Sequence, residues 1–337
     1  MPSSCACSPP SGPGDPPVSR PAPGPPYAAD PRLQQSAPVP AVAGVSRGWL
    51  SIDVAKGSPP AAAGREAAAY SGSVSEVLTV DIADQVAFVR LNRPDKRNAL
   101  SMELMRDLQA TARRLGGDRR LRAVVLSGNG KAFCAGIDLS VLADAKGAFV
   151  KGFLPRPRGT NVFQEACWAW RRMPIPVLAV VHGTCFGAGI QLALAADFRF
   201  TTPDAQWSVM ESKWGLVPDM SGVHALSQLL PIDVAKRMSM TGEIISGERA
   251  AELGLATAVA ADPHTAAGEL VDAILLRSPD SVSASKRLFD QTWHRGPRFT
   301  FTRERAEQLR LLFARNTAIA RKVATAQQAP EYAPRPR

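Results

Sequence analysis

The sequence contains few cysteines, few aromatic residues and no long apolar run. Its five cysteines, among 337 residues, show neither the spacing of a zinc site nor that of a disulfide framework, and its four histidines are scattered. We therefore expect no metal site, and we expect reduced thiols in a cytosol-like compartment. No stretch approaches the ~18 apolar residues of a membrane span. The N-terminus lacks a basic segment followed by an apolar core, which excludes a secretory signal but leaves organellar import open.

Positive charge is in excess, with a formal net charge of +10. Much of the excess falls in residues 298–337, which carry nine basic and three acidic side chains. No basic stripe interleaved with aromatic residues is present, so we expect no nucleic-acid partner. The basic C-terminal region fits a solvated helix face, and it fits a phosphorylated small molecule equally well.

Proline is unevenly distributed, since 15 of the 29 prolines fall in residues 1–75. A proline-rich region without apolar periodicity cannot bury enough surface to offset its ordering entropy. We therefore predict a disordered extension over residues 1–75 and a folded core over 76–270. A C-terminal helical region over 271–326 and a disordered tail over 327–337 complete the predicted organisation.

The folded part alternates strand-like and helix-like patterns, which predicts an α/β fold. Residues 75–94 read as a hairpin ended by Pro94, and residues 122–128 and 175–183 read as buried strands. A helix is predicted from Met102, with Ser101 as its N-cap and Gly116 as its C-cap signal. The stretch 306–324 places apolar side chains on one helical stripe, so that helix should pack on its own domain or on a neighbouring subunit.

Two predicted strands each run through a turn of small residues into a helix. The stretches are "VVLSGNGKAFCAGIDL" (124–139) and "AVVHGTCFGAGIQL" (179–192). Small residues let a ligand approach the backbone, and a helix start offers unpaired N–H groups. Two such turns, brought together, either aim two N–H groups at one oxygen, as in an oxyanion hole, or simply pack tightly.

Several motifs in order resemble the crotonase family, also called the enoyl-CoA hydratase/isomerase family. They are "LNRPDKRNAL", "GKAFCAGIDL", "VHGTCFGAGIQLALAADFRF", "AQWSVMESKWGLVPDMSG" and "ISGERAAELGLATAV", within about Val77–Leu288. The resemblance implies a spiral of ββα units, homotrimers or dimers of trimers, and an acyl-CoA substrate whose CoA is the only cofactor-like group. It places the enolate donors on the N–H groups of Ile137 and Ala188. The CoA-binding residues that it implies are Lys96, Arg97, Ala99, Cys134, Ala135, Gly136, Asp138 and Gly187.

The acidic residues decide which reaction the resemblance implies. Hydratases of this family hold a water between two glutamates, and the first of these positions is Gln191 here while the second is Glu211. Gln191 is a polar pocket residue that cannot exchange a proton at neutral pH. Glu211 and Asp219, eight residues apart, resemble two acids of dienoyl-CoA isomerases, but a third acid of those enzymes also falls at Gln191, so the sequence departs from both patterns. That resemblance assigns the C2 proton to Asp219 and the distal carbon to Glu211. Asp219 has a second interpretation, as the cap of the following helix.

Three functions remain open on these residues. The first is a double-bond isomerase of unsaturated acyl-CoA in fatty acid metabolism, of the dienoyl-CoA type. The second is an enoyl-CoA hydratase in which Glu211 is the only working carboxylate and Gln191 orients the water. The third is a weakly catalytic acyl-CoA-binding subunit, which the missing acid at Gln191 suggests.

Overall fold

A seven-stranded sheet forms the base of the fold in the computed structural model. The structure describes residues 70–143, 152–155, 157, 159–326 and 330–336; most of the predicted disordered extension, residues 1–69, lies outside them. The strand order is β1-β2-β3-β4-β6-β8-β11. The bounds are β1 Tyr70–Ser75, β2 Leu78–Ala83, β3 Val86–Leu91, β4 Ala123–Gly128, β6 Val177–Val181, β8 Phe198–Thr201 and β11 Ala258–Val259. The first three strands pair antiparallel, and the pairs from β3 onward are parallel.

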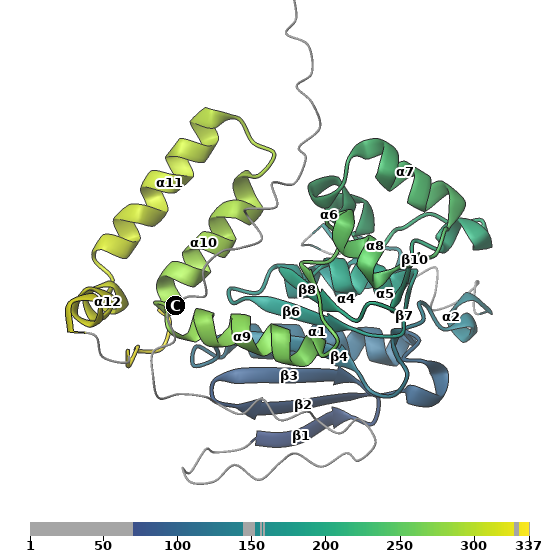
Figure 1. The fold of residues 1–337 in the computed structure, drawn as a ribbon, viewed down its shortest axis with the longest axis horizontal. Helices are drawn as coiled ribbons and strands as arrows, with labels where there is room; N and C mark the ends of the chain where they lie inside the picture. Colours follow the sequence, from purple (N-terminus) through teal and green to yellow (C-terminus); the bar gives the residue numbers. More distant parts are fainter. Residues whose placement is uncertain (1–69, 144–151, 156, 158, 327–329, 337) are drawn as a thin grey trace, which may run out of the picture. The chain divides into compact units, whose positions relative to one another are not determined.

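Helices cover both faces of this sheet because its central strands are apolar on both sides. Within β4, Val124 and Leu126 pack into the larger core cluster, whereas Ala123 and Val125 pack into a smaller one. The larger cluster is closed by α1 (Met102–Gly117), α4 (Val162–Arg171) and α5 (Ala188–Leu194). The smaller one is closed by α9 (Pro263–Leu275), which lies across the sheet in Figure 1.

A second sheet of four short strands continues from the ends of the first. Its order is β10-β9-β7-β5, with bounds β5 Ala132–Cys134, β7 Thr184–Phe186, β9 Gln206–Ser208 and β10 Ile245–Ser246. The strands β5, β7 and β9 are parallel. Short helices join and follow them, namely η2 (Pro94–Lys96), α2 (Leu139–Ala143), η3 (Glu211–Trp214), α6 (Gly222–Leu229), α7 (Ile232–Thr241) and α8 (Gly247–Glu252).

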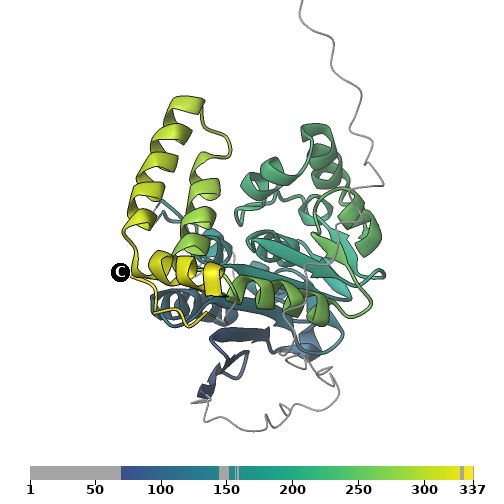
Figure 2. The same ribbon diagram turned by 60° about the vertical axis from the view of Figure 1, so that its left-hand side comes forward.

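Three helices end the chain, α10 (Pro279–Thr292), α11 (Pro297–Leu312) and α12 (Arg315–Ala326). The first two lie side by side in both ribbon views (Figures 1 and 2). A partly buried ion pair anchors α10, since Lys286 Nζ lies 2.6 Å from Asp197 Oδ2 and donates to the carbonyl of Ile175 at 3.0 Å. No helix among the described residues is long and apolar enough to cross a membrane.

Both predicted disordered segments contain ordered residues, which corrects their boundaries. Within 1–75, Tyr70–Ser75 form strand β1 and pair with β2. Within 327–337, the described residues 330–336 are held by side chains of the folded part. Asn316 bonds both the N–H and the C=O of Ala333, and Arg335 donates to the carbonyl of Asp118 at 2.8 Å.

Candidate active site

The two predicted turns come together at one edge of the second sheet. The strands β5 and β7 are parallel neighbours, so their carboxyl ends lie side by side. Gly136 follows β5 with φ +108°, and a Cβ placed there would lie 3.1 Å from the carbonyl oxygen of Phe186 and 3.8 Å from the Ala188 nitrogen. Gly187, with φ +51°, is the N-cap of α5. Both positions favour glycine, since L side chains rarely adopt such φ values.

Two backbone N–H groups are left without a partner where the turns meet. Leu100 forms a parallel bridge with Ile137, in which Leu100 N–H bonds the Gly136 carbonyl and Leu100 C=O accepts from Asp138. This pattern leaves the N–H of Ile137 unused. Ala188 is the first residue of α5, where a helix has no internal acceptor. Within the described part of the chain, neither N–H donates to another backbone group.

Glu211 lies beside the second turn, at the start of η3. A Cβ placed on Gly187 would lie 3.6 Å from Glu211 Oε1. The Glu211 side chain is only 9% exposed, and its Oε2 has no hydrogen-bond partner among the described residues. Burial raises the pKa of this carboxyl, while backbone N–H groups and the Gln191 amide oppose the rise. Oε2 is buried and carries no hydrogen bond from a described residue, so it is the oxygen of Glu211 that is left to accept a proton.

Gln191 joins Glu211 to the loop that follows it. Gln191 lies on α5 and is 2% exposed. Its Nε2 donates to Glu211 Oε1 at 2.5 Å. Its Oε1 accepts from the N–H groups of Met220 at 2.8 Å and Gly222 at 2.9 Å. One amide thus contacts the carboxylate and the start of α6 together.

Asp219 is half-buried in that loop and does not cap the following helix. The N-cap of α6 is Ser221, at φ 72°, whose own side chain makes no capping hydrogen bond, and the N–H of Gly222 at the helix start bonds to Gln191 Oε1 instead of Asp219. The capping interpretation of Asp219 is therefore wrong. Burial raises the pKa of the Asp219 carboxyl, opposed only by its own backbone N–H.

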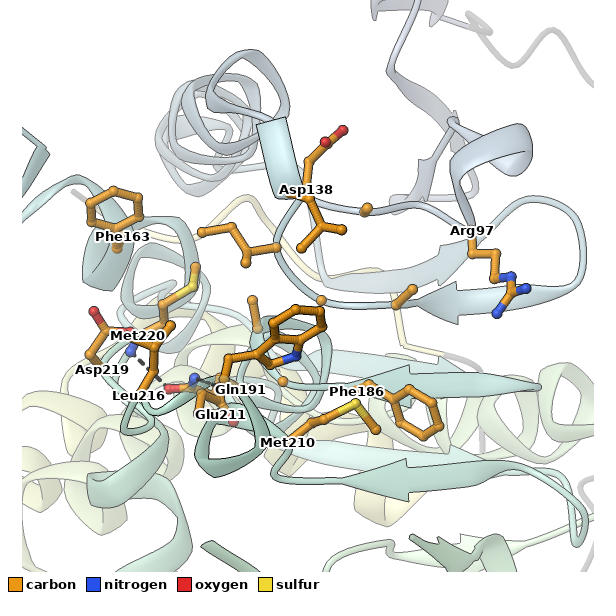
Figure 3. Close-up of a pocket in the computed structure, with 18 of the residues that line it drawn as sticks. Arg97, Asp138, Phe163, Phe186, Gln191, Met210, Glu211, Leu216, Asp219 and Met220 are labelled. Atoms are coloured by element: carbon orange, nitrogen blue, oxygen red, sulfur yellow. Dashed lines mark hydrogen bonds between the residues drawn. The ribbon is translucent and has the colours of Figure 1, made fainter. Parts of the chain in front are cut away.

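A cavity of about 760 Å³ connects these groups, and all but one of the predicted site residues line it. Lys96, Arg97, Ala99, Ala135, Gly136, Ile137, Asp138, Gly187, Ala188, Gln191, Glu211 and Asp219 are in its wall. Cys134 is not: its side chain is fully buried, and its thiol contacts the carbonyl of Asn98 at 3.1 Å. In Figure 3, Arg97 lies at one end, Asp219 and Phe163 lie at the other, and Gln191 and Glu211 lie between them.

The end of the cavity near Arg97 is positively charged, and its backbone is left-handed at two successive residues. Arg97 follows η2 with a left-handed φ of 46°, and buried Asn98 next to it, at φ 56°, donates to the carbonyls of Asn129 and Ala132 at 2.9 and 2.8 Å. The Asp138 carboxylate accepts a hydrogen bond from the Ser140 N–H and forms an ion pair with Arg93 at 2.9 Å. The pKa of Asp138 is lowered, above all by the Ser140 N–H. Lys96 and Arg97 are therefore the charged groups placed to meet a phosphate.

The cavity wall also contains residues that the sequence did not single out, and most of them are apolar. They are Leu139, Phe153, Phe163, Thr184, Phe186, Met210, Trp214, Leu216, Val217 and Met220. Several of them are sequence neighbours of Glu211 and Asp219 in the stretch "VMESKWGLVPDM", and this proximity could have identified them as cavity residues. Phe153 and Phe163 pack with ring centroids 4.8 Å apart and belong to the region 142–163, part of which lies outside the described residues.

Comparisons with known proteins agree with this architecture. The sequence model of the enoyl-CoA hydratase/isomerase family matches residues 81–312. The probable enoyl-CoA hydratase EchA14 of Mycobacterium tuberculosis is 37% identical over 235 residues, which cover 70% of this chain and 89% of that protein. The hydroxycinnamoyl-CoA hydratase-lyase of Pseudomonas fluorescens is 30% identical over 256 residues, which cover 70% of this chain and 87% of that protein. A crystal structure of an enoyl-CoA hydratase of Mycobacterium smegmatis aligns with a TM-score of 0.70 at 28% identity, over 76% of this chain and 99% of that one.

The chain belongs to the enoyl-CoA hydratase/isomerase family, and it is an enzyme with the crotonase fold. The predicted α/β class and the predicted family are confirmed.

Proposed function

We propose that the protein moves double bonds in an unsaturated acyl-CoA thioester through an enolate, with 3,5-dienoyl-CoA as the substrate type. The observation that carries the proposal is the pair of carboxyls, buried Glu211 and half-buried Asp219, in one cavity beside two free backbone N–H groups. The N–H groups of Ile137 and Ala188 would hold the thioester oxygen. They would stabilise the negative charge that develops there when a C2 proton leaves.

Glu211 is proposed as the base at C2. C2 is bonded to the thioester carbonyl carbon, so the base must lie close to the oxyanion donors, and both carboxylate oxygens of Glu211 lie within 4.0 Å of a Cβ placed on Gly187. The hydrogen bond from Gln191 favours the ionised form of Glu211, as a base requires. This assignment exchanges the two roles that the family resemblance implied.

Asp219 is proposed as the acid at the far end of the conjugated system. It lies with Phe163 at the end of the cavity opposite Arg97, where the acyl chain would extend if Lys96 and Arg97 held the CoA phosphates (Figure 3). Its burial without a charged partner favours the protonated form. Glu211 would take a C2 proton, the electrons would shift toward C6, and Asp219 would give its proton to C6. A proton passing through solvent from Glu211 would restore Asp219.

The experiment is to incubate the purified chain with 3,5-dienoyl-CoA and, separately, with 2-enoyl-CoA. We expect a 2,4-dienoyl-CoA chromophore to appear from the first substrate and little loss of the enoyl chromophore of the second. Glu211→Gln should abolish turnover and leave thioester binding intact. Loss of the enoyl chromophore without any dienoyl isomerisation would refute the proposed reaction.

Enoyl-CoA hydration is the second candidate function, favoured by the names of the relatives, which include hydratases. Glu211 would then both activate water and protonate C2. Against it stands Gln191, whose carbonyl oxygen already accepts two backbone N–H groups and is not free to orient a water. If neither substrate reacts but acyl-CoA still binds, the protein is the weakly catalytic acyl-CoA-binding subunit.

The proposal includes a homotrimer or a dimer of trimers. Large apolar side chains are exposed on α10, at its C-cap and on α11, among them Phe289, Trp293, Phe301 and Leu309, and burial against another subunit would remove them from water. The buried free thiols Cys134, Cys167 and Cys185 suit the proposed cytoplasmic compartment. Sedimentation of the full chain measures the assembly size.

A further inference from the structure

Gln191 makes more contacts than a residue that merely fills the wall of a pocket. Its carbonyl oxygen accepts two backbone N–H groups, from Met220 and Gly222, and its amide nitrogen donates to Glu211. A carbonyl oxygen has two lone pairs, so its capacity is used in full. The amide therefore has a defined orientation: the nitrogen must face the carboxylate, because the backbone N–H groups can only donate to the oxygen.

We propose that Gln191 is a positioning residue that fixes which oxygen of Glu211 meets the substrate and holds the Asp219 loop against α5. The amide occupies Oε1 of Glu211 and leaves Oε2 as the oxygen without a partner. The carbonyl oxygen of the same amide accepts from the N–H groups of Met220, which directly follows Asp219, and of Gly222. The base and the loop that carries the acid thus share one contact. This inference rests on the proposed function for its meaning in catalysis, but the contact itself can be tested without a substrate.

The groups around Glu211 determine how its pKa responds when the Gln191 hydrogen bond is removed. Asp219 is the titratable side chain that acts on Glu211 from the neighbouring loop, and its negative charge, when it is ionised, raises the pKa of Glu211. The thiol of Cys167, on α4, has its pKa raised well above the usual value, above all by burial, so it remains neutral. The hydrogen bonds that lower the pKa of Glu211 come from the backbone N–H groups of Met210 and Glu211 and from the Gln191 amide. Removal of the amide donor should therefore raise the pKa of Glu211.

The test is an infrared titration of the full chain without substrate. The band of Glu211 is assigned as the carboxyl signal that disappears in Glu211→Gln. In Gln191→Glu the side chain keeps its length and still accepts from Met220 and Gly222, but it places a second carboxyl where the donor was. We expect the midpoint of the Glu211 band to rise by about one pH unit or more. Gln191→Met, which removes donor and acceptor together, should raise it in the same direction, and it carries the test if Gln191→Glu does not fold.

A matched control lies in the C-terminal region. Asn316 on α12 is also a buried amide, which donates to Asp280 Oδ1 at 3.1 Å and accepts from Ala333 N–H at 2.8 Å. Asn316→Asp makes the same chemical change beside a carboxylate that does not line the cavity. It should destabilise the chain and leave the midpoint of Glu211 where it is in the unchanged protein.

An unaltered Glu211 midpoint in both Gln191 variants, each folded by circular dichroism, would overturn the inference. With a substrate, we expect Gln191→Glu to lower kcat at least tenfold, to change KM less than about threefold, and to shift the acidic limb of the kcat profile upward. If the unchanged protein isomerises no dienoyl-CoA but the titration behaves as expected, the proposed reaction fails and the role of Gln191 stands. If isomerisation occurs but the midpoint does not move, the role of Gln191 fails and the proposed reaction stands.

Discussion

Ala188→Pro removes one proposed oxyanion donor and leaves the rest of helix α5 in place. Ala188 is the first residue of α5, and proline is favoured at this position because the N–H lost there has no partner within the helix. The chain itself begins α9, α10 and α11 with Pro263, Pro279 and Pro297. The fold should therefore accept the substitution, with a melting temperature close to that of the unchanged protein.

The loss of activity follows from the position of the missing hydrogen. One oxyanion donor contributes about 3–4 kcal/mol to the transition state, so kcat should fall by ~10²–10³. The ring carbon of proline would also occupy the place of the N–H, at the point where the Gly136 turn and the Ala188 nitrogen approach. Ala188→Gly keeps the N–H and should retain much more of the activity than Ala188→Pro. Initial rates on 3,5-dienoyl-CoA measure both variants, and a folded Ala188→Pro enzyme with unchanged kcat would refute the oxyanion assignment.

Two further predictions concern buried charge. Lys286→Met should lower the free energy of unfolding by about 1.5–3 kcal/mol in urea titrations, because it leaves the partly buried carboxylate of Asp197 without its cation and with the N–H of Val177 as a remaining donor; a loss below about 1 kcal/mol would contradict it. Asp219→Asn should raise the melting temperature at about pH 8, because the raised pKa of Asp219 means that its stabilising contribution is lost as pH rises through the folded pKa. The difference should vanish at about pH 3, below the ordinary pKa of an aspartate carboxyl, where the group is protonated in the folded and the unfolded state, and a gain that is equal at both pH values would contradict this account.

Local sequence patterns predicted the elements that build the site. Ser101 does cap α1, where it accepts from the N–H of Leu104, because capping depends on residues three apart. The residues of the two turns do line one cavity, because small residues after parallel strands meet at one sheet edge. Cys134 was the exception: it is the last residue of β5, and its side chain points into the core rather than into the cavity.

Contacts distant in sequence were out of reach. The hydrogen bonds of Gln191 to Met220 and Gly222 span 29 and 31 residues, so no local pattern could reveal that its carbonyl is already occupied. Strand β1 was missed because "YSGSVS" has no apolar alternation and is held by backbone pairing with β2. The end of the chain was missed for a similar reason, since a proline-rich segment gives no sign that Asn316 holds its backbone.

The most direct test of the assignment of the base to Glu211 and the acid to Asp219 is the exchange of the C2 hydrogens of 3,5-dienoyl-CoA with deuterium from solvent, followed by mass spectrometry. Asp219→Asn should still exchange these hydrogens, within about tenfold of the turnover rate of the unchanged enzyme, but should form no 2,4-dienoyl product. Glu211→Gln should do neither. Exchange that persists in Glu211→Gln and disappears in Asp219→Asn would contradict the account.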